Sequence, residues 1–152
     1  VRPKPLKAMP SIKMTTSAKE LAAVWAKDHG YTLVPQGLEA AHRLGLQQQA
    51  PMKVVYWSSG PSREFRIGNE VVEVKHRADR ALLWPNKPEG SLLRGLLVLS
   101  PGEVTDSEVM LAFKRLSLAK PEALQAIKKL RDQVLPQDWQ KKLAHCEEVL
   151  MQ

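Results

Sequence analysis

The residues of this chain best suited to metal binding or catalysis are its four histidines and single cysteine. His145 and Cys146 are adjacent, and neighbouring helical residues point about 100° apart, so this pair would chelate a metal poorly. Glu39 and His42 have the spacing of an acid–base pair, but an ion pair on a helix surface explains it better. We therefore expect no catalytic residue, metal, cofactor or small-molecule substrate. An active site assembled from distant residues, as in a nuclease, is the alternative.

A short serine-rich segment, residues 58–62 (Ser-Ser-Gly-Pro-Ser), offers a second kind of chemistry. With Arg63 beside it, the segment could form a phosphate-binding nest, although a plain hairpin loop explains it better. Trp57 and Trp84 could stack on nucleic-acid bases, but we expect both to pack in the core.

Basic residues are frequent in the middle of the chain. One interpretation is a solubilising outer face with cross-strand ion pairs to the nearby glutamates. The other is a surface for nucleic acid or an acidic partner, whose binding would depend steeply on salt. The residues concerned are Arg43, Lys53, Arg63, Arg66, Lys75, Arg77 and Arg80.

The net charge of +7 is unevenly distributed over the 152 residues. Residues 1–13 hold four basic residues, no acid and three prolines, which predicts a flexible basic arm or linker over residues 1–14. The remainder, residues 15–152, has the length and apolar content of a single domain. No run of eighteen apolar residues is present, and one cysteine cannot form an internal disulfide, so we expect a cytoplasmic protein without a membrane span.

Local signals predict an α+β fold. Ser17 followed by Glu20 forms a capping box that opens a helix ending at Gly30. A short strand over residues 31–34 and a short helix over residues 37–44 follow. Residues 52–57 form a β-prone segment, the segments 63–67 and 71–75 alternate charged and apolar residues, and Gly68-Asn69 is a turn signal. We predict an antiparallel three-stranded meander from these segments, packed against helices.

The second half of the chain is predicted to be helical. Residues 92–99 form an apolar segment that suits a core helix. Thr105 with Glu108 makes another capping box, and Pro121 and Pro136 suit the starts of two further helices.

The string from Pro35 to Leu46, followed by Pro51, Gly60 and Gly68, resembles the AbiEi-like antitoxins of type IV toxin–antitoxin systems. Members of that group share a proline, a small-residue helix with paired alanines, Leu-Gly-Leu, and strands separated by glycines. The resemblance covers residues 17–80 well and 90–150 loosely. The matching residues are Pro35, Gly37, Ala40, Ala41, Leu44, Gly45, Leu46, Pro51, Gly60 and Gly68.

The resemblance implies a non-enzymatic antitoxin or transcriptional regulator. Such a protein opposes a nucleotidyltransferase-like toxin encoded by a neighbouring gene without a stable complex, and represses its own operon by binding DNA. It also implies a winged-helix DNA-binding domain upstream of residues 1–10, so we expect that part to be missing here. The alternative is a stand-alone nucleic-acid-binding module that uses the basic face of the meander.

Overall fold

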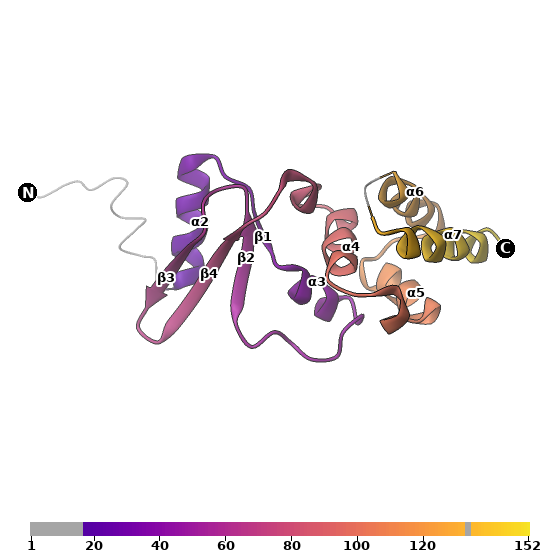
Figure 1. Ribbon diagram of the computed structural model, residues 1–152, viewed down its shortest axis with the longest axis horizontal. Coiled ribbons are helices and arrows are strands. Elements are labelled where there is room, and N and C mark those ends of the chain that lie inside the picture. The colour runs from indigo at the N-terminus through magenta and orange to yellow at the C-terminus, as the bar shows by residue number, and fades with distance from the viewer. Residues whose placement is uncertain (1–16, 133–134) are drawn as a thin grey trace, which may run out of the picture. The chain divides into compact units, whose positions relative to one another are not determined.

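The computed structural model describes residues 17–132 and 135–152 (Figure 1) and confirms the α+β class with a helical C-terminal half. These residues form two compact units, each built from two separate segments of chain. The first unit contains residues 17–34 and 53–77, and the second contains residues 35–52 and 78–152. The predicted arm, residues 1–14, lies outside the described residues. One domain over residues 15–152 stays a prediction.

The first unit begins with helix α2, Ala18–His29, and local capping explains both of its ends. The Ser17 hydroxyl accepts a hydrogen bond from the Glu20 amide, as the capping box predicts. Gly30 ends the helix with φ of 73°, a left-handed conformation that suits glycine.

The sheet contains β1 (Leu33–Pro35), β2 (Val54–Ser58), β3 (Arg63–Ile67) and β4 (Glu70–His76). Its strand order is β1-β2-β4-β3, so the predicted antiparallel meander is wrong. β3 and β4 form the expected antiparallel hairpin, whereas β2 pairs with β4 in parallel, with Val54 opposite Val72.

The position of β4 between its neighbours explains this order. Val72 and Val74 are almost completely buried, as expected for a central strand, while β3 lies at the edge and carries charged side chains. The chain passes from β2 to β3 across the end of β4 through residues 59–62. Hydrogen bonds between serine hydroxyls and backbone amides, rather than a tight turn, hold this connection in place. The length of the connection therefore does not predict which strands pair.

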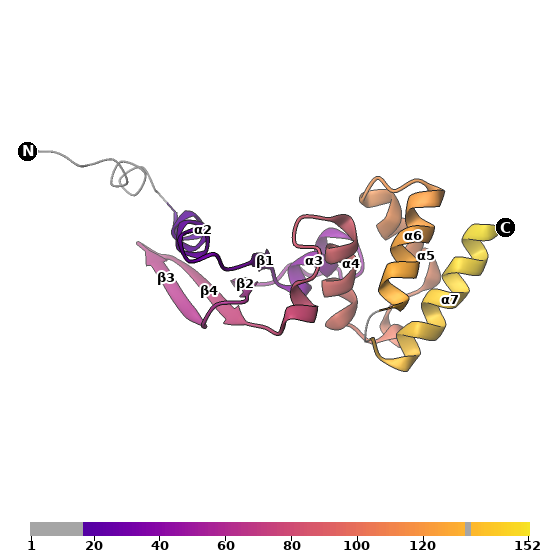
Figure 2. The same ribbon diagram turned by 90° about the horizontal axis from the view of Figure 1, so that it is seen from above.

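Helix α2 covers one face of the sheet (Figures 1 and 2). Ala18 and Ala22 pack against Phe65, Val72 and Val74 to form a small core. The alanines allow the helix backbone to approach the strands closely, and the Ala18 amide donates a 2.7 Å hydrogen bond to the Glu70 carboxylate.

The second unit is helical. It contains α3 (Gly37–Arg43), α4 (Pro88–Leu97), α5 (Asp106–Arg115), α6 (Lys120–Arg131) and α7 (Gln137–Met151). Two short 3₁₀ helices, Asp79–Leu82 and Pro101–Glu103, lie between the longer ones. The predicted Thr105–Glu108 capping box is present at the start of α5. Helix α4 begins at Pro88, four residues before the predicted apolar segment, because proline suits the first helical turn.

The core of the second unit is larger than that of the first and includes Trp139, which is 1% exposed. Its indole N–H donates a 3.0 Å hydrogen bond to the Leu99 carbonyl, so burial leaves no polar atom of the ring unpaired. Helices α3 and α4 meet where Gly95 faces Ala41, and a Cβ atom on Gly95 would lie 3.4 Å from the Ala41 backbone. Small residues on both helices permit this approach.

Candidate functional site

The structure divides the seven predicted basic residues between the two units. Lys53, Arg63, Arg66, Lys75 and Arg77 belong to the first unit. Arg43 and Arg80 belong to the second, on α3 and on the 3₁₀ helix after β4. The proposed surface in the first unit therefore consists of five residues rather than seven.

Two of these five basic residues are paired with carboxylates, as the solubilising interpretation expects. Arg66 lies 2.8 Å from Glu64 on the same strand. Lys53 lies 3.5 Å from Glu73. These exposed pairs contribute little to stability, about 0–1 kcal/mol each, but they reduce the positive charge available to an anionic partner.

The other three, Arg63, Lys75 and Arg77, form what we call the sheet-end cluster. In the part of the chain that the structure describes, none of them has a carboxylate partner. Arg63 opens β3 in register with Val74, so all three residues lie at the end of the β3–β4 pair away from the Gly68-Asn69 turn, with Arg63 on the face that α2 covers and Lys75 on the opposite face. They line a shallow hollow of about 590 Å³ together with Ser62, Glu64 and Glu73.

Aromatic rings position two of the guanidinium groups in the sheet-end cluster. The Arg63 Cζ atom lies 4.6 Å from the centre of the Phe65 ring and 5.3 Å from that of Trp25. The Arg77 Cζ atom lies 5.1 Å from the centre of the Trp57 ring. Such contacts attract the cation without neutralising its charge, so both guanidinium groups remain able to bind an anion.

The serine-rich segment beside Arg63 supports the surrounding backbone. The Ser58, Ser59 and Ser62 hydroxyls accept hydrogen bonds from the backbone amides of Gly60, Thr32 and His76, respectively. The Gly60 amide is therefore already bonded, and the phosphate-nest interpretation receives no support. The hairpin-loop interpretation is wrong in one respect, because the segment joins strands that are not neighbours.

The tryptophans considered for base stacking are packed against protein. Trp57 is 6% exposed, and Trp84 is partly buried against the core of the second unit. Core packing is therefore confirmed for both, and the nucleic-acid hypothesis depends on charge rather than on stacking.

The chemistry-bearing residues of the sequence are not brought together. His145 is a surface residue whose Nδ1 lies 2.8 Å from Asp106, while Cys146 is fully buried and its pKa is raised to about 11, mainly by burial. Glu39 pairs with Arg43 at 2.8 Å, one residue beyond the expected His42.

Within residues 17–132 and 135–152, no three histidine, cysteine or carboxylate side chains are grouped as a metal site requires. No helix in this part is both long and apolar enough to cross a membrane.

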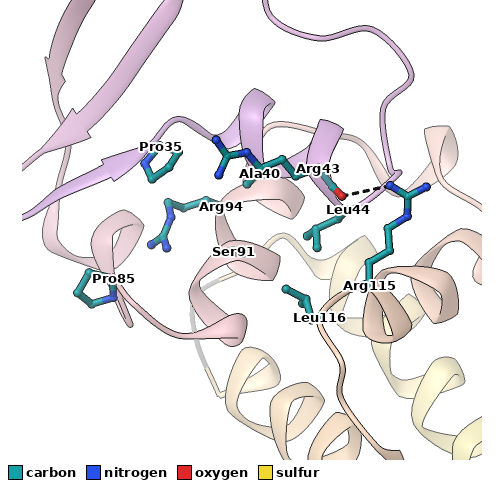
Figure 3. A pocket seen from close by; sticks show the side chains of 9 residues that line it. All are labelled: Pro35, Ala40, Arg43, Leu44, Pro85, Ser91, Arg94, Arg115 and Leu116. Atoms are coloured by element: carbon teal, nitrogen blue, oxygen red, sulfur yellow. Dashed lines mark hydrogen bonds between the residues drawn. The ribbon is translucent and has the colours of Figure 1, made fainter. Parts of the chain in front are cut away.

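A pocket that the sequence does not reveal lies in the second unit, among arginines from α3, α4 and α5 (Figure 3). Its volume is about 270 Å³, and its lining includes Arg43, Arg94 and Arg115 together with Pro35, Ser91 and Leu116. Among the residues that the structure describes, no acidic side chain lines it. The Arg43 backbone carbonyl accepts a 3.3 Å hydrogen bond from Arg115, the dashed line in Figure 3.

Arg94 is the unusual residue of this pocket, because its side chain is charged and only 2% exposed. Burial lowers its pKa to about 10, which still leaves it protonated at neutral pH. Its Nη1 atom donates to the carbonyl oxygens of Leu83, at 2.9 Å, and Ala81, at 3.5 Å. The sequence held one signal for it: a single arginine inside the apolar run of residues 92–97.

The residues that carry the antitoxin resemblance have structural roles. Gly45 and Gly68 adopt φ angles of 79° and 59°, which favour glycine. Ala40, Ala41, Leu44 and Leu46 are buried. Pro35 ends β1, and Gly37 begins α3. These roles explain the pattern through folding rather than through chemistry.

Comparison with known proteins identifies a family but no characterised relative. No curated protein and no solved structure matches the chain. A model of the family DUF6088 matches residues 1–124, which is most of the sequence. The chain therefore belongs to DUF6088, a family of unknown function.

Proposed function

We propose that this chain is a non-enzymatic regulatory domain of the antitoxin class that acts by binding an anionic partner through the sheet-end cluster. The observation that carries the binding part is the gathering of Arg63, Lys75 and Arg77 at one end of the sheet, with no carboxylate partner among the described residues. The antitoxin part rests on the resemblance from Pro35 to Asn69.

Nucleic acid is the partner that best suits this cluster. Arginine and lysine side chains bind phosphate groups without reading sequence, so we expect affinity with little sequence preference. Each phosphate contact releases counterions, and the logarithm of the affinity falls with that of the salt concentration by about 0.9 per contact. Loss of two contacts should therefore lower this slope by about 2.

Fluorescence anisotropy with duplex DNA at several salt concentrations tests the binding part. The Lys75→Glu/Arg77→Glu variant should bind weakly. The matched control, Lys19→Glu/Lys27→Glu, makes the same change in charge at two exposed residues of α2 in the same unit. Equal loss in both variants would show that only total charge matters, and affinity that ignores salt would refute phosphate binding.

Co-expression tests the antitoxin part. The product of a neighbouring gene should be toxic alone, and this chain should restore growth. A neighbour that is harmless, or that remains toxic when the chain is present at normal levels, would refute the antitoxin role. If Lys75→Glu/Arg77→Glu restores growth yet fails to bind DNA, the two parts of the proposal are separate activities.

A further inference from the structure

Strand β3 forms the outer edge of the sheet in the first unit. It is the last of the described strands in the order β1-β2-β4-β3, and it lies at the edge of the sheet in both views (Figures 1 and 2). It pairs with β4 without interruption, from Arg63 opposite Val74 to Ile67 opposite Glu70, and it contains neither a proline nor a bulge. A regular edge of this kind can accept another strand.

The turn between β3 and β4 determines which backbone groups of β3 point outward. Gly68-Asn69 is a two-residue turn, so Ile67 and Glu70, which flank it, exchange backbone hydrogen bonds. Bonded pairs alternate with non-bonded pairs along an antiparallel ladder. The N–H and C=O groups of Glu64 and Arg66 therefore point away from β4. Among the described residues, neither of these two amides donates to a loop or to a side chain.

The side chains at these two outward positions carry opposite charges. Glu64 and Arg66 are 44% and 66% exposed, and they lie 2.8 Å apart. Both are on the face away from α2, because Phe65 between them packs under that helix. The edge therefore presents one acid and one base, placed symmetrically about Phe65.

This symmetry makes the edge complementary to a second copy of itself. If two β3 strands run antiparallel with Phe65 opposite Phe65, Glu64 of each copy lies opposite Arg66 of the other. The outward backbone groups of both strands also meet in this alignment. Alignments centred on Glu64 or on Arg66 join the backbones as well, but they place like charges opposite each other, which is destabilising.

Apolar side chains beside the edge would also be covered by a second copy. Leu21 and Trp25 of α2 pack against the core of the first unit but are only partly buried. The Trp25 ring lies on the β3 side, with its centre 5.5 Å from that of Phe65. Ile67 on β3 is partly exposed as well. Burial of this surface would add to the backbone hydrogen bonds.

We propose that two copies of this chain associate through β3, antiparallel about Phe65, and so form one continuous sheet across a twofold axis. A twofold dimer uses the same surface on both subunits, which requires a self-complementary edge such as this one. The backbone hydrogen bonds supply affinity, and the pairs between Glu64 and Arg66 of different copies fix the alignment. The inference does not depend on the antitoxin role or on anion binding.

Protection of the edge is the competing explanation, because charged side chains on an edge strand often prevent pairing. The ion pair within β3 does not block a second strand. Its two residues have Cα atoms about 6.7 Å apart, whereas residues of a bonded cross-strand pair have Cα atoms about 5.5 Å apart. Both charges can therefore also reach a second copy. Protection predicts a monomer at every concentration.

Sedimentation velocity of the full chain separates these explanations. We expect a reversible dimer whose population rises with concentration between about 10 μM and 1 mM, since a short edge makes a small interface. The measurement needs moderate salt, because the net charge of +7 repels the copies unless it is screened. A monomer throughout this range would overturn the proposal.

Charge reversal tests the alignment. Arg66→Glu and Glu64→Arg each place like charges opposite each other, so each variant should dimerise about ten-fold more weakly or worse. An equimolar mixture of the two variants should dimerise again, because every glutamate then faces an arginine. An effect of net charge alone would instead move the two variants in opposite directions, and that result would overturn the proposal.

Lys27→Glu is the matched control, since it makes the same change in charge as Arg66→Glu at an exposed residue of α2. It should dimerise as the wild type does. Equal weakening by Lys27→Glu, or a mixture of Arg66→Glu and Glu64→Arg that stays monomeric, would overturn the proposed interface.

Amide hydrogen exchange gives a direct readout at β3. The amides of Glu64 and Arg66 should exchange fast in dilute protein and become protected at concentrations where the dimer forms. The Phe65 amide already bonds β4, so it should be protected at both concentrations. If the amides of Glu64 and Arg66 exchange equally fast in the dimer, the interface lies elsewhere and the proposal fails.

Discussion

Gly60 shows how a single missing side chain positions the first unit. A Cβ atom at Gly60 would lie only 2.4 Å from the Tyr31 ring, which itself packs against Trp25 at a centroid distance of 5.1 Å. The ring has little room to move, since His29 stacks on it as well. The resemblance to antitoxins included Gly60, and close approach rather than a turn accounts for it.

Gly60→Ala should therefore destabilise the protein by about 1–3 kcal/mol through overpacking. Gly102→Ala is the control, because a Cβ atom there meets nothing within 4 Å and its φ is not left-handed. That change should shift stability by less than about 1 kcal/mol. Urea denaturation followed by circular dichroism compares the two variants, and equal effects would contradict the role of Tyr31.

Cys146 makes stability depend on pH in the alkaline range. Its folded pKa of about 11 lies above the value near 8.5 of an unfolded cysteine. The folded state therefore retains the thiol proton that the unfolded state loses, so this contribution is complete below about pH 8.5 and is lost as pH rises to about 11.

The difference in free energy of unfolding between wild type and Cys146→Ala should fall by roughly 2–3 kcal/mol across that range. Other alkaline titrations are common to both proteins and cancel in the comparison. Denaturation at pH 8 and pH 10.5 measures this difference, and a constant value would contradict the raised pKa.

Arg94 marks the limit of what single residues reveal from sequence. A lone arginine in an apolar helix signals something unusual, but the other arginines that line the pocket come from α3 and α5, 51 and 21 residues away along the chain. Spacing along one helix cannot show that three helices bring their arginines to one cavity.

Helices were the elements that the sequence predicted best, because their ends are fixed by neighbouring residues. The caps at Ser17, Gly30 and Thr105 lie where local signals placed them. Strands β2, β3 and β4 were also found, within two residues at each end. Their order was not, because apolar alternation is the same whether a strand pairs in parallel or antiparallel with its neighbour.

An ion pair between two helices gives a prediction at this scale. Lys129 on α6 lies 2.8 Å from Glu89 on α4, and this hydrogen bond is the main cause of the lowered Glu89 pKa. A lowered folded pKa adds stability above the unfolded value, near pH 4, and that stability is lost as pH falls through the folded pKa.

Lys129→Met should therefore reduce stability by about 0.5–1 kcal/mol at pH 7, a modest amount because the lysine is partly exposed. The loss should vanish in acid, once Glu89 is protonated. Lys128→Met is the matched control, since it removes a charge from the adjacent, exposed position. Thermal denaturation at pH 7 and pH 3 separates the two, and a loss that persists at pH 3 would indicate packing instead.

The whole molecule is built from two units that share one chain in an interleaved way. The chain passes between the units three times, after residues 34, 52 and 77. The described part of the first unit is close to the size, about 40 residues, below which a domain rarely folds alone. We therefore expect the two units to unfold together, in keeping with the prediction of one domain.

A destabilising change in one unit tests this expectation in the other. Gly60→Ala, in the first unit, should lower the urea midpoint at which Cys146, in the second unit, reacts with a thiol reagent. The shift should equal that seen by circular dichroism, because coincident transitions indicate two-state unfolding. An unchanged thiol midpoint would show that the units unfold separately.

The parallel pairing of β2 with β4 also has a consequence for the order in which the chain folds. The β3–β4 hairpin closes through two residues, and hairpins form in about 1–10 μs. β2 pairs with the edge of β4 that faces away from β3, where Val54 lies opposite Val72, so this pairing needs β4 to be in place. Such non-local contacts are slow because chain entropy is lost before they form. The slowest step in the folding of the first unit should therefore be the pairing of β2 with β4, after the β3–β4 hairpin has formed.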